Sequence, residues 1–315
     1  MSNIQKLSLK DPNVDLMIIE NAYIKENKID ILKKNKKDIF YPTMYKSWCN
    51  KINEYIIFEE KDSIEPVDNN EILIIFDSFG LSSYYHLLID TIIPVWITKK
   101  IVSNYLNLNT NYNYNFLNIS DKSRENKLKN ANNIFKYFLN NNYTDYINNK
   151  YKYIIYGYCY DYRPYHGPFI SLRYFPKYQF MFDAFYDTFS LNENNKEKYI
   201  VIASRSTRSY RYMNTICDIV SKYYTTKIVD FSEYSIEEQI EISKNAWAII
   251  GSEGAAFSNQ IFMEKKSLLI CIGETHKFHS SLSQYLEHDF YNLPMESENC
   301  VNDILDIIKK FTSLS

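Results

Sequence analysis

The sequence predicts an α/β protein with two lobes and a cleft between them. In the last third of the chain, strand-like and helix-like segments alternate strictly, with short connections. Such alternation is typical of a doubly wound parallel sheet covered on both faces. A polar segment, 190–198, separates this region from a less regular half that also mixes strands and helices. We therefore predict an N-terminal lobe over residues 1–191 and a C-terminal lobe over residues 192–315.

Apolar runs and end signals mark each element of the C-terminal lobe. Ser235 stands three residues before Glu238, which is the spacing of a capping box at the start of a helix. The apolar runs predict strands at 197–203, 227–231, 246–251, 267–273 and 289–293. The intervening patterns predict helices at 213–223, 235–246, 257–263, 280–288 and 301–314.

The N-terminal half carries similar but less regular signals. A long helix is predicted over 83–102, with Pro94 inside it or at a kink. Two strands around a turn are expected within 15–32. Further strands are expected at 55–60, 71–77 and 151–158, and shorter helices at 134–139 and 178–189.

The composition is that of a globular protein and excludes several classes of function. Hydrophobic residues make up 45% and charged residues 23% of the chain, and the net charge of −2 gives no case for a nucleic-acid partner. The five cysteines form no CxxC pair, which argues against a zinc ribbon or a disulfide scaffold. No apolar run is long enough for a membrane span and no signal peptide is found, so we expect a cytoplasmic location. The segment 107–118 is rich in Asn and Tyr, but the chain holds 30 Tyr, so it gives no indication of binding.

An apolar run ends in two glycines, Gly251 and Gly254, within the segment WAIIGSEGAAFSNQIFME at 247–264. The whole chain contains 6 glycines, so this spacing is informative. A strand that breaks on glycine into a helix presents free N–H groups and a helix dipole to an anion. An ordinary strand-to-helix turn is the alternative. The carboxylate of Glu253 at the centre of the turn is unexpected in an anion site.

Three arginines follow the first strand of the same lobe, in the segment ASRSTRSYRYMN at 203–214. Arg205, Arg208 and Arg211 are expected at the carboxyl end of that strand, where open α/β sheets bind ligands. Guanidinium groups suit a diphosphate, because they bind it bidentately and keep their charge. A solvated basic loop is the alternative interpretation.

His86 and Asp90 stand four residues apart in the long apolar helix of the N-terminal lobe. This spacing predicts that both lie on one face, one turn apart, as base and orienting group, or with Asp90 as the base alone. A buried histidine in a local helix pair is the alternative. An aspartate in an otherwise apolar segment needs a reason, because burying a charge is costly.

Two loops carry polar side chains with less specific signals. They contain Asp161, Arg163 and His166 in the segment 160–169, and Glu274, His276 and His279 in 273–281. Two histidines and a glutamate are able to bind a metal ion, but a polar loop is the more frequent explanation. No D-x-D metal–sugar motif and no G-x-S-x-G elbow occur. We predict no metal site.

The order and spacing of these motifs resemble glycosyltransferase family 61. The C-terminal signature of the family runs roughly H-G-A-G-L-T-N-x-x-F-M before an apolar strand, and EGAAFSNQIFM at 253–263, followed by SLLICIG, is similar. The strand-plus-arginine element of the family is matched through Arg205, Arg211 and Asn214, and a helix with an early glutamine follows. YYHLLIDTIIP matches its H-x-x-x-D helix. The resemblance covers roughly residues 72–275.

This resemblance implies two Rossmann-like lobes in a GT-B-like arrangement, inverting transfer, and a nucleotide-sugar donor such as a UDP-sugar, with no further cofactor. The acceptor would be a glycan or glycoprotein hydroxyl. Asp90 would be the base that deprotonates it, with His86 beside it, and no metal would be needed if arginines and N–H groups neutralise the diphosphate. The residues expected to bind the donor are Arg205, Arg208, Arg211, Asn214, Gly251, Ser252, Glu253, Gly254, Ala255, Ser258 and Asn259.

Two positions depart from the family pattern. Glu253 stands where the family has a histidine, and Ala256 where it has a second glycine. A carboxylate repels phosphate, so Glu253 is expected to accept hydrogen bonds from ribose or sugar hydroxyls, or to mark a changed donor or lost catalysis. A catalytically silent nucleotide- or glycan-binding module is therefore the alternative function. An unrelated α/β enzyme acting on phosphate esters is a third interpretation.

Overall fold

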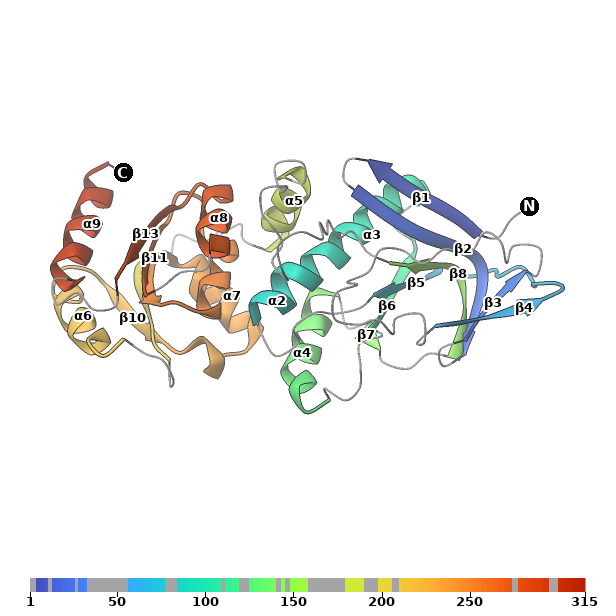
Figure 1. Cartoon of the computed structure of the whole chain (residues 1–315), viewed down its shortest axis with the longest axis horizontal. Coiled ribbons are helices and arrows are strands. Elements are labelled where there is room, and N and C mark those ends of the chain that lie inside the picture. Colours follow the sequence, from blue (N-terminus) through green and yellow to red (C-terminus); the bar gives the residue numbers. More distant parts are fainter. Residues whose placement is uncertain are drawn as a thin grey trace. The chain divides into compact units, whose positions relative to one another are not determined.

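The computed structural model describes residues 4–10, 13–25, 28–32, 56–76, 84–108, 111–118, 125–139, 143–144, 148–157, 179–189, 198–205, 210–273, 277–294 and 300–314. Within these ranges the protein contains two sheets and mixed helices, which confirms the predicted α/β class. The chain separates into two compact units, Met1–Ile170 and Ser171–Ser315, and each is described by itself (Figure 1). This division and the predicted one differ over 171–191, a stretch that includes α5 (Gln179–Phe189).

The second unit contains a five-stranded sheet in which every strand pairs in parallel with its neighbours. The order across the sheet is β10 (Thr226–Val229), β9 (Tyr199–Ala203), β11 (Ala246–Ser252), β12 (Leu268–Ile272) and β13 (Asp289–Leu293). All five strands agree with the apolar runs in the sequence. From β9 the chain first adds β10 on one side and then crosses back to add β11 on the other side of β9. The direction in which strands are added to the sheet therefore reverses, and the point of reversal lies between β9 and β11.

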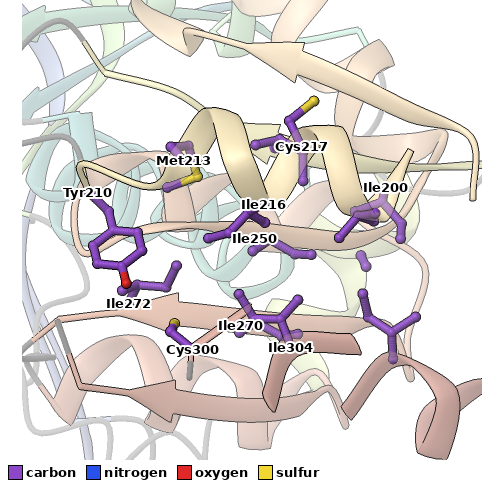
Figure 2. Close-up of a cluster of buried hydrophobic side chains, with 14 of the residues drawn as sticks. Ile200, Tyr210, Met213, Ile216, Cys217, Ile250, Ile270, Ile272, Cys300 and Ile304 are labelled. Carbon is purple, nitrogen blue, oxygen red and sulfur yellow. The ribbon is translucent and has the colours of Figure 1, made fainter. Parts of the chain in front are cut away.

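Alternate side chains of these strands build one hydrophobic layer on each face of the sheet. The first layer packs against α6 (Met213–Val220) and α9 (Cys300–Leu314), and its strand residues include Ile200, Ile202, Ile250 and Ile270 (Figure 2). The second layer packs against α7 (Ile236–Lys244) and the 3-10 helix η6 (Ala255–Phe262), and its strand residues include Val201, Ile249 and Leu269. Burial on both faces explains why these strands are continuous apolar runs in the sequence.

The helices of this unit agree with the sequence in position, but one differs in type. The predicted capping box is present at the start of α7, where the Ser235 hydroxyl accepts from the Glu238 N–H and the Glu238 carboxylate accepts from the Ser235 N–H. The helix predicted at 257–263 is the 3-10 helix η6. Its polar side chains Asn259 and Gln260 bond to neighbouring segments. The remaining helices are η5 (Phe231–Glu233) and α8 (Lys277–Tyr285).

The first unit is built on an eight-stranded mixed sheet. Its parallel part places β5 (Glu71–Phe76) between β8 (Asn148–Tyr156) and β6 (Asn113–Asn118), with β7 (Tyr143–Thr144) parallel to β6. In the other part, β2 (Asn13–Lys25) pairs antiparallel with β8, β1 and β3, and β4 pairs in parallel with β3. The last three strands named are β1 (Ile4–Lys10), β3 (Lys28–Leu32) and β4 (Ile57–Lys61).

The sequence patterns do not predict β1, β6 or β7. β6 falls inside the Asn- and Tyr-rich segment 107–118. Two of its asparagines bond to the neighbouring strand, since the amides of Asn113 and Asn115 both donate to the Glu71 carboxylate of β5, at 3.0 and 2.6 Å. Phe116 of the same strand is buried. Contacts across the sheet therefore form a strand from residues with low strand propensity.

The long predicted helix is present, but its geometry changes midway. It consists of α2, the π-helical turn η2 and α3, which span Tyr84–Leu87, Leu88–Ile92 and Ile93–Tyr105. Pro94 has no N–H, and in an uninterrupted α-helix its ring would collide with the carbonyl group of Asp90. The wider turn, in which the Ile93 N–H donates to the Leu88 carbonyl, accommodates the proline.

α4 (Glu125–Phe138) contacts the sheet of the first unit through Phe135, whose ring centroid lies 5.5 Å from that of Phe76 in β5. Among the described residues, no helix of either unit combines the length and the apolar character that crossing a membrane requires.

Candidate functional site

Two of the predicted donor-binding motifs meet at the carboxyl edge of the sheet in the second unit. Arg205 follows the end of β9, and the residues Gly251 to Gly254 form the end of β11 and the turn after it. The two motifs are 48 residues apart in sequence, measured from Arg205 to Glu253. The chain reverses its progress across the sheet between these two strands, and open parallel sheets bind ligands at such a place.

Both glycines of the turn lie close to other atoms, and the backbone conformation of Gly254 also favours glycine. A Cβ added at Gly251 would lie 2.8 Å from the Cβ of Ala203 in β9, which is too close. A Cβ added at Gly254 would overlap the guanidinium group of Arg205. Gly254 also has φ 157° and ψ −177°, a region of backbone conformation that is almost exclusive to glycine. The turn is therefore shaped around the arginine.

Arg205 is tied to the turn by a hydrogen bond. Its Nη1 donates to the backbone carbonyl of Glu253 at 2.5 Å. Within the described part of the chain, the guanidinium group makes no other hydrogen bond, so its remaining N–H donors are available to a ligand. A half-buried positive charge is thus held at the carboxyl ends of β9 and β11.

The turn also presents backbone N–H groups. The first backbone hydrogen bond of η6 runs from the Phe257 N–H to the Gly254 carbonyl, at 3.1 Å. The N–H groups of Ala255 and Ala256 precede it and have no acceptor among the residues that the structure describes. Free N–H groups at a helix start attract an anion. Together with Arg205, they form a cradle of hydrogen-bond donors whose chemistry suits an anion.

Glu253 is fixed through its backbone on both sides. Its N–H donates to the carbonyl of Ile272 at the end of β12, at 3.1 Å, and its carbonyl accepts from Arg205. The Cβ of Glu253 lies 3.9 Å from the place where a Cβ would stand at Gly273. The carboxylate makes no ion pair with Arg205 or with any other described residue. The acid of the turn is therefore a neighbour of the arginine and not its partner.

Tyr210 anchors the arginine-bearing segment 203–214 (the arginine loop) near its C-terminal end, and the sequence patterns did not indicate this residue. Its N–H donates to the Ser252 hydroxyl at 2.8 Å. Its ring is buried in the layer shown in Figure 2, with the hydroxyl group toward Cys300. An aromatic residue between two arginines at a strand end is the signal that would have indicated it. In a chain with 30 Tyr, that signal is weak.

The other polar residues of this loop differ from Arg205 in their surroundings. Arg208 lies outside the described residues. Arg211 is exposed, and its guanidinium group stacks 4.5 Å above the ring centroid of Tyr212. Asn214 is exposed in the first turn of α6. Contacts of Arg211 and Asn214 with a donor therefore stay predictions.

Ser258 and Asn259 are buried side chains beneath the turn. The Asn259 amide donates to the Gln239 side chain of α7 at 3.3 Å, and the Gln239 amide donates to the Tyr234 carbonyl at 3.0 Å. The Ser258 hydroxyl has no hydrogen-bond partner among the described residues. The Asn259 side chain thus ties η6 to α7. Contacts of Ser258 and Asn259 with a donor stay predictions.

A second buried network anchors η6 from the side of α8 and β13. The Ser283 hydroxyl donates to the Gln260 side chain at 2.7 Å, and His288 Nε2 donates to the Gln260 carbonyl at 3.1 Å. The Ser267 N–H donates to His288 Nδ1 at 3.1 Å, which requires a neutral imidazole with its proton on Nε2. Burial lowers the pKa of His288 to about 4, against the opposing effect of its bond to Gln260.

His86 and Asp90 belong to the first unit, on α2 and on the π-helical turn η2 respectively. The prediction that they share one helix face assumes 3.6 residues per turn, whereas the helix widens from Leu88 onward. Their side chains lie outside what the structure describes. Their roles as base and orienting group therefore stay predictions.

The weaker candidates do not form a second site within the described residues. His279 is buried in α8, with its ring centroid 5.7 Å from that of Phe257. Among these residues, no three His, Cys, Asp or Glu side chains gather in a way that could hold a metal ion. Burial raises the pKa of the Cys271 thiol to about 12, and Glu253 adds to the effect. Residues outside the described ranges include Asp161, Arg163, His166, Glu274 and His276.

The fold and the site define an α/β protein that places an arginine and free N–H groups at the carboxyl edge of a parallel sheet. Residues 84–270, more than half of the chain, match the family model described as Glycosyltransferase 61. The chain therefore belongs to glycosyltransferase family 61, as its motifs indicated. Membership implies glycosyltransferase activity, with a donor and an acceptor substrate. No curated protein matches the sequence.

Replacing Gly254 by alanine should destabilise the second unit for two reasons. The new Cβ overlaps the Arg205 guanidinium group, and the positive φ at position 254 is a backbone conformation that alanine disfavours. We expect a loss of about 2 kcal/mol in the free energy of unfolding, measured by urea denaturation. In an R205A background, the cost of G254A should be smaller, because the obstructing side chain is gone. Equal costs in the two backgrounds would show that Arg205 does not shape the turn.

The neutral state of His288 predicts a loss of stability in acid. Its pKa of about 4 in the folded chain lies below the ordinary value of 6.5, so the unfolded chain takes up the proton first as the pH falls. The contribution of the neutral His288 side chain to the free energy of unfolding is complete above pH 6.5. It is lost progressively as the pH falls to about 4, and the total loss is on the order of 3 kcal/mol. Thermal unfolding across this window measures it. H288Q keeps one donor and one acceptor without titrating, so a wild-type pH dependence in H288Q would contradict the assignment.

Proposed function

We propose that this chain transfers a sugar from a UDP-sugar to a hydroxyl group of a glycan or protein, with inversion at the anomeric carbon. The observation that carries the proposal is the fixed Arg205 guanidinium beside the free N–H groups of Ala255 and Ala256. A diphosphate leaving group gains negative charge as the sugar departs. Donors that are held in place before the reaction stabilise that charge most in the transition state.

The acceptor side of the proposal rests on Asp90. Inversion needs a base on the face of the sugar opposite to the leaving group, and Asp90 is the candidate, with His86 beside it in sequence. Asp90 lies in a π-helical turn, and such turns occur frequently at functional sites. We extend the proposal to a GT-B-like arrangement of two Rossmann-like lobes, in which one lobe supplies the base and the other binds the donor.

A further part of the proposal follows from the charges at the cradle. Arg205, Arg211 and the N–H groups of η6 would neutralise the diphosphate, so that transfer proceeds without a metal ion.

Donor binding is tested first. UDP and UDP-sugars should raise the melting temperature of the full chain in the presence of EDTA. R205A should weaken their binding about tenfold or more, because a charge-assisted hydrogen bond is lost, as measured by isothermal titration calorimetry. UDP binding without hydrolysis or transfer of any donor would identify a silent binding module. Failure of every nucleotide to bind would contradict the proposal and favour an enzyme acting on phosphate esters.

Catalysis by Asp90 is tested separately. D90N should lower the rate of transfer at least about a hundredfold, because the acceptor hydroxyl loses its base, while the affinity for UDP stays unchanged. Asp62 is an exposed acid of the same unit, and D62N should transfer sugar at the wild-type rate. Wild-type transfer by D90N would show that the base lies elsewhere.

A further inference from the structure

The cradle contains a negative charge that the binding of an anion does not explain. Glu253 lies between the Arg205 guanidinium, which binds its carbonyl, and the free N–H groups of Ala255 and Ala256. Both of its backbone groups are engaged, the N–H with Ile272 and the carbonyl with Arg205, so the position of the residue is fixed. A carboxylate at this position weakens the attraction of the cradle for phosphate.

The Glu253 side chain is half-buried, yet no described residue forms an ion pair with it. Its neighbour at the end of β12 is Gly273, so no side chain from that position covers it. Gly273 itself is held in place, since its N–H donates to the Leu293 carbonyl at 2.9 Å. The side chain therefore carries a charge that is unpaired among the described residues, at the same edge of the sheet as the cradle.

The chemistry of a carboxylate limits which ligands can bind to it. Both of its oxygens are acceptors, so a ligand must supply donors, and two neighbouring hydroxyl groups match its two oxygens. A diphosphate at neutral pH supplies no donor and is repelled. A nucleotide sugar carries such hydroxyl pairs on both sides of its diphosphate, on the ribose and on the transferred sugar.

We propose that Glu253 binds a vicinal diol of the donor and so makes the cradle selective for nucleotide sugars over simple phosphate anions. This inference rests on the proposed function, because it assumes that a diphosphate lies against Arg205 and η6. Glu253 acts as a specificity-determining residue: it lowers the affinity for anions without hydroxyl groups and restores affinity for donors with them.

The test measures selectivity, which a merely structural glutamate would not change. Binding of inorganic pyrophosphate, UDP, 2′,3′-dideoxy-UDP, UDP-glucose and UDP-xylose to the full chain and to E253Q is measured by calorimetry. E253Q should bind pyrophosphate a few-fold more tightly, because a repulsive charge is removed. Its preference for the diol ligand over pyrophosphate should fall on the order of tenfold, because a charge-assisted bond is lost. E253A should show the same change in preference.

The control is E264Q, which removes the same charge from the amino edge of the sheet, where Glu264 pairs with Lys198. Its preferences should equal those of the wild type. Melting temperatures show that each variant is folded.

The ligands distinguish the two sources of the diol. If Glu253 binds the ribose, E253Q loses affinity for UDP but not for the dideoxy analogue. If it binds the transferred sugar, E253Q loses affinity for UDP-glucose and UDP-xylose but not for UDP. If E253Q changes the dissociation constants of all five ligands by the same factor, the inference is overturned and the proposed function stays intact. A wild-type chain that binds none of the nucleotides overturns both.

Discussion

The geometry of the site depends on the hydrogen bond between the Arg205 guanidinium and the Glu253 carbonyl. It joins the segments that follow β9 and β11, the two strands between which the chain reverses its progress across the sheet. A Cβ at position 254 would occupy the space of the guanidinium group, so the glycine leaves room for the bond. One arginine and one glycine thus decide where the positive charge of the cradle lies.

The rest of the second unit holds this arrangement still. The Tyr210 N–H bonds to Ser252 and fixes the end of the arginine loop. Beneath the turn, Asn259 ties η6 to α7, and Gln260 ties it to α8 and to His288. Burying so many polar groups is costly unless each finds a partner, and these bonds supply partners for most of them. The network fixes the N–H groups of η6 before a ligand arrives, which is the arrangement that electrostatic stabilisation of a leaving group needs.

The sequence predicted what local patterns encode and missed what distant contacts decide. The strands of the second unit are buried on both faces, so their continuous apolar runs were sufficient to predict them. The capping box at Ser235 was predictable because it depends on residues only three apart in the sequence. β6 was not predictable in this way, because the Asn113 and Asn115 amides bond to Glu71 of another strand. The side-chain bonds of η6, such as that from Asn259 to Gln239, likewise reach outside their own segment and cannot be read from its pattern.

For the site, the two motifs in the second unit could be found from their positions after strands, and their meeting follows from the parallel topology. Which of their residues face a ligand could not be read from the sequence. Asn259 matches the family motif, yet its side chain is a buried tie to Gln239. Tyr210 matches no motif, yet it anchors the loop. A sequence motif does not separate residues that hold a turn in place from residues that are free to contact a ligand, because the bonds that distinguish them join distant segments.

The acid at the centre of the turn is tolerated because Arg205 binds its carbonyl and not its carboxylate. If the two side chains formed an ion pair, the cradle would lose its positive charge and the acid its capacity to bind hydroxyl groups. Engaging the backbone instead leaves both charges unpaired among the described residues, with the guanidinium beside the N–H groups of η6 and the carboxylate on the residue between them in the chain. Such a separation suits a ligand that is itself divided into an anionic diphosphate and neutral, hydroxyl-rich sugars. A carboxylate in place of the family histidine is therefore compatible with donor binding, provided that the donor brings hydroxyl groups to it.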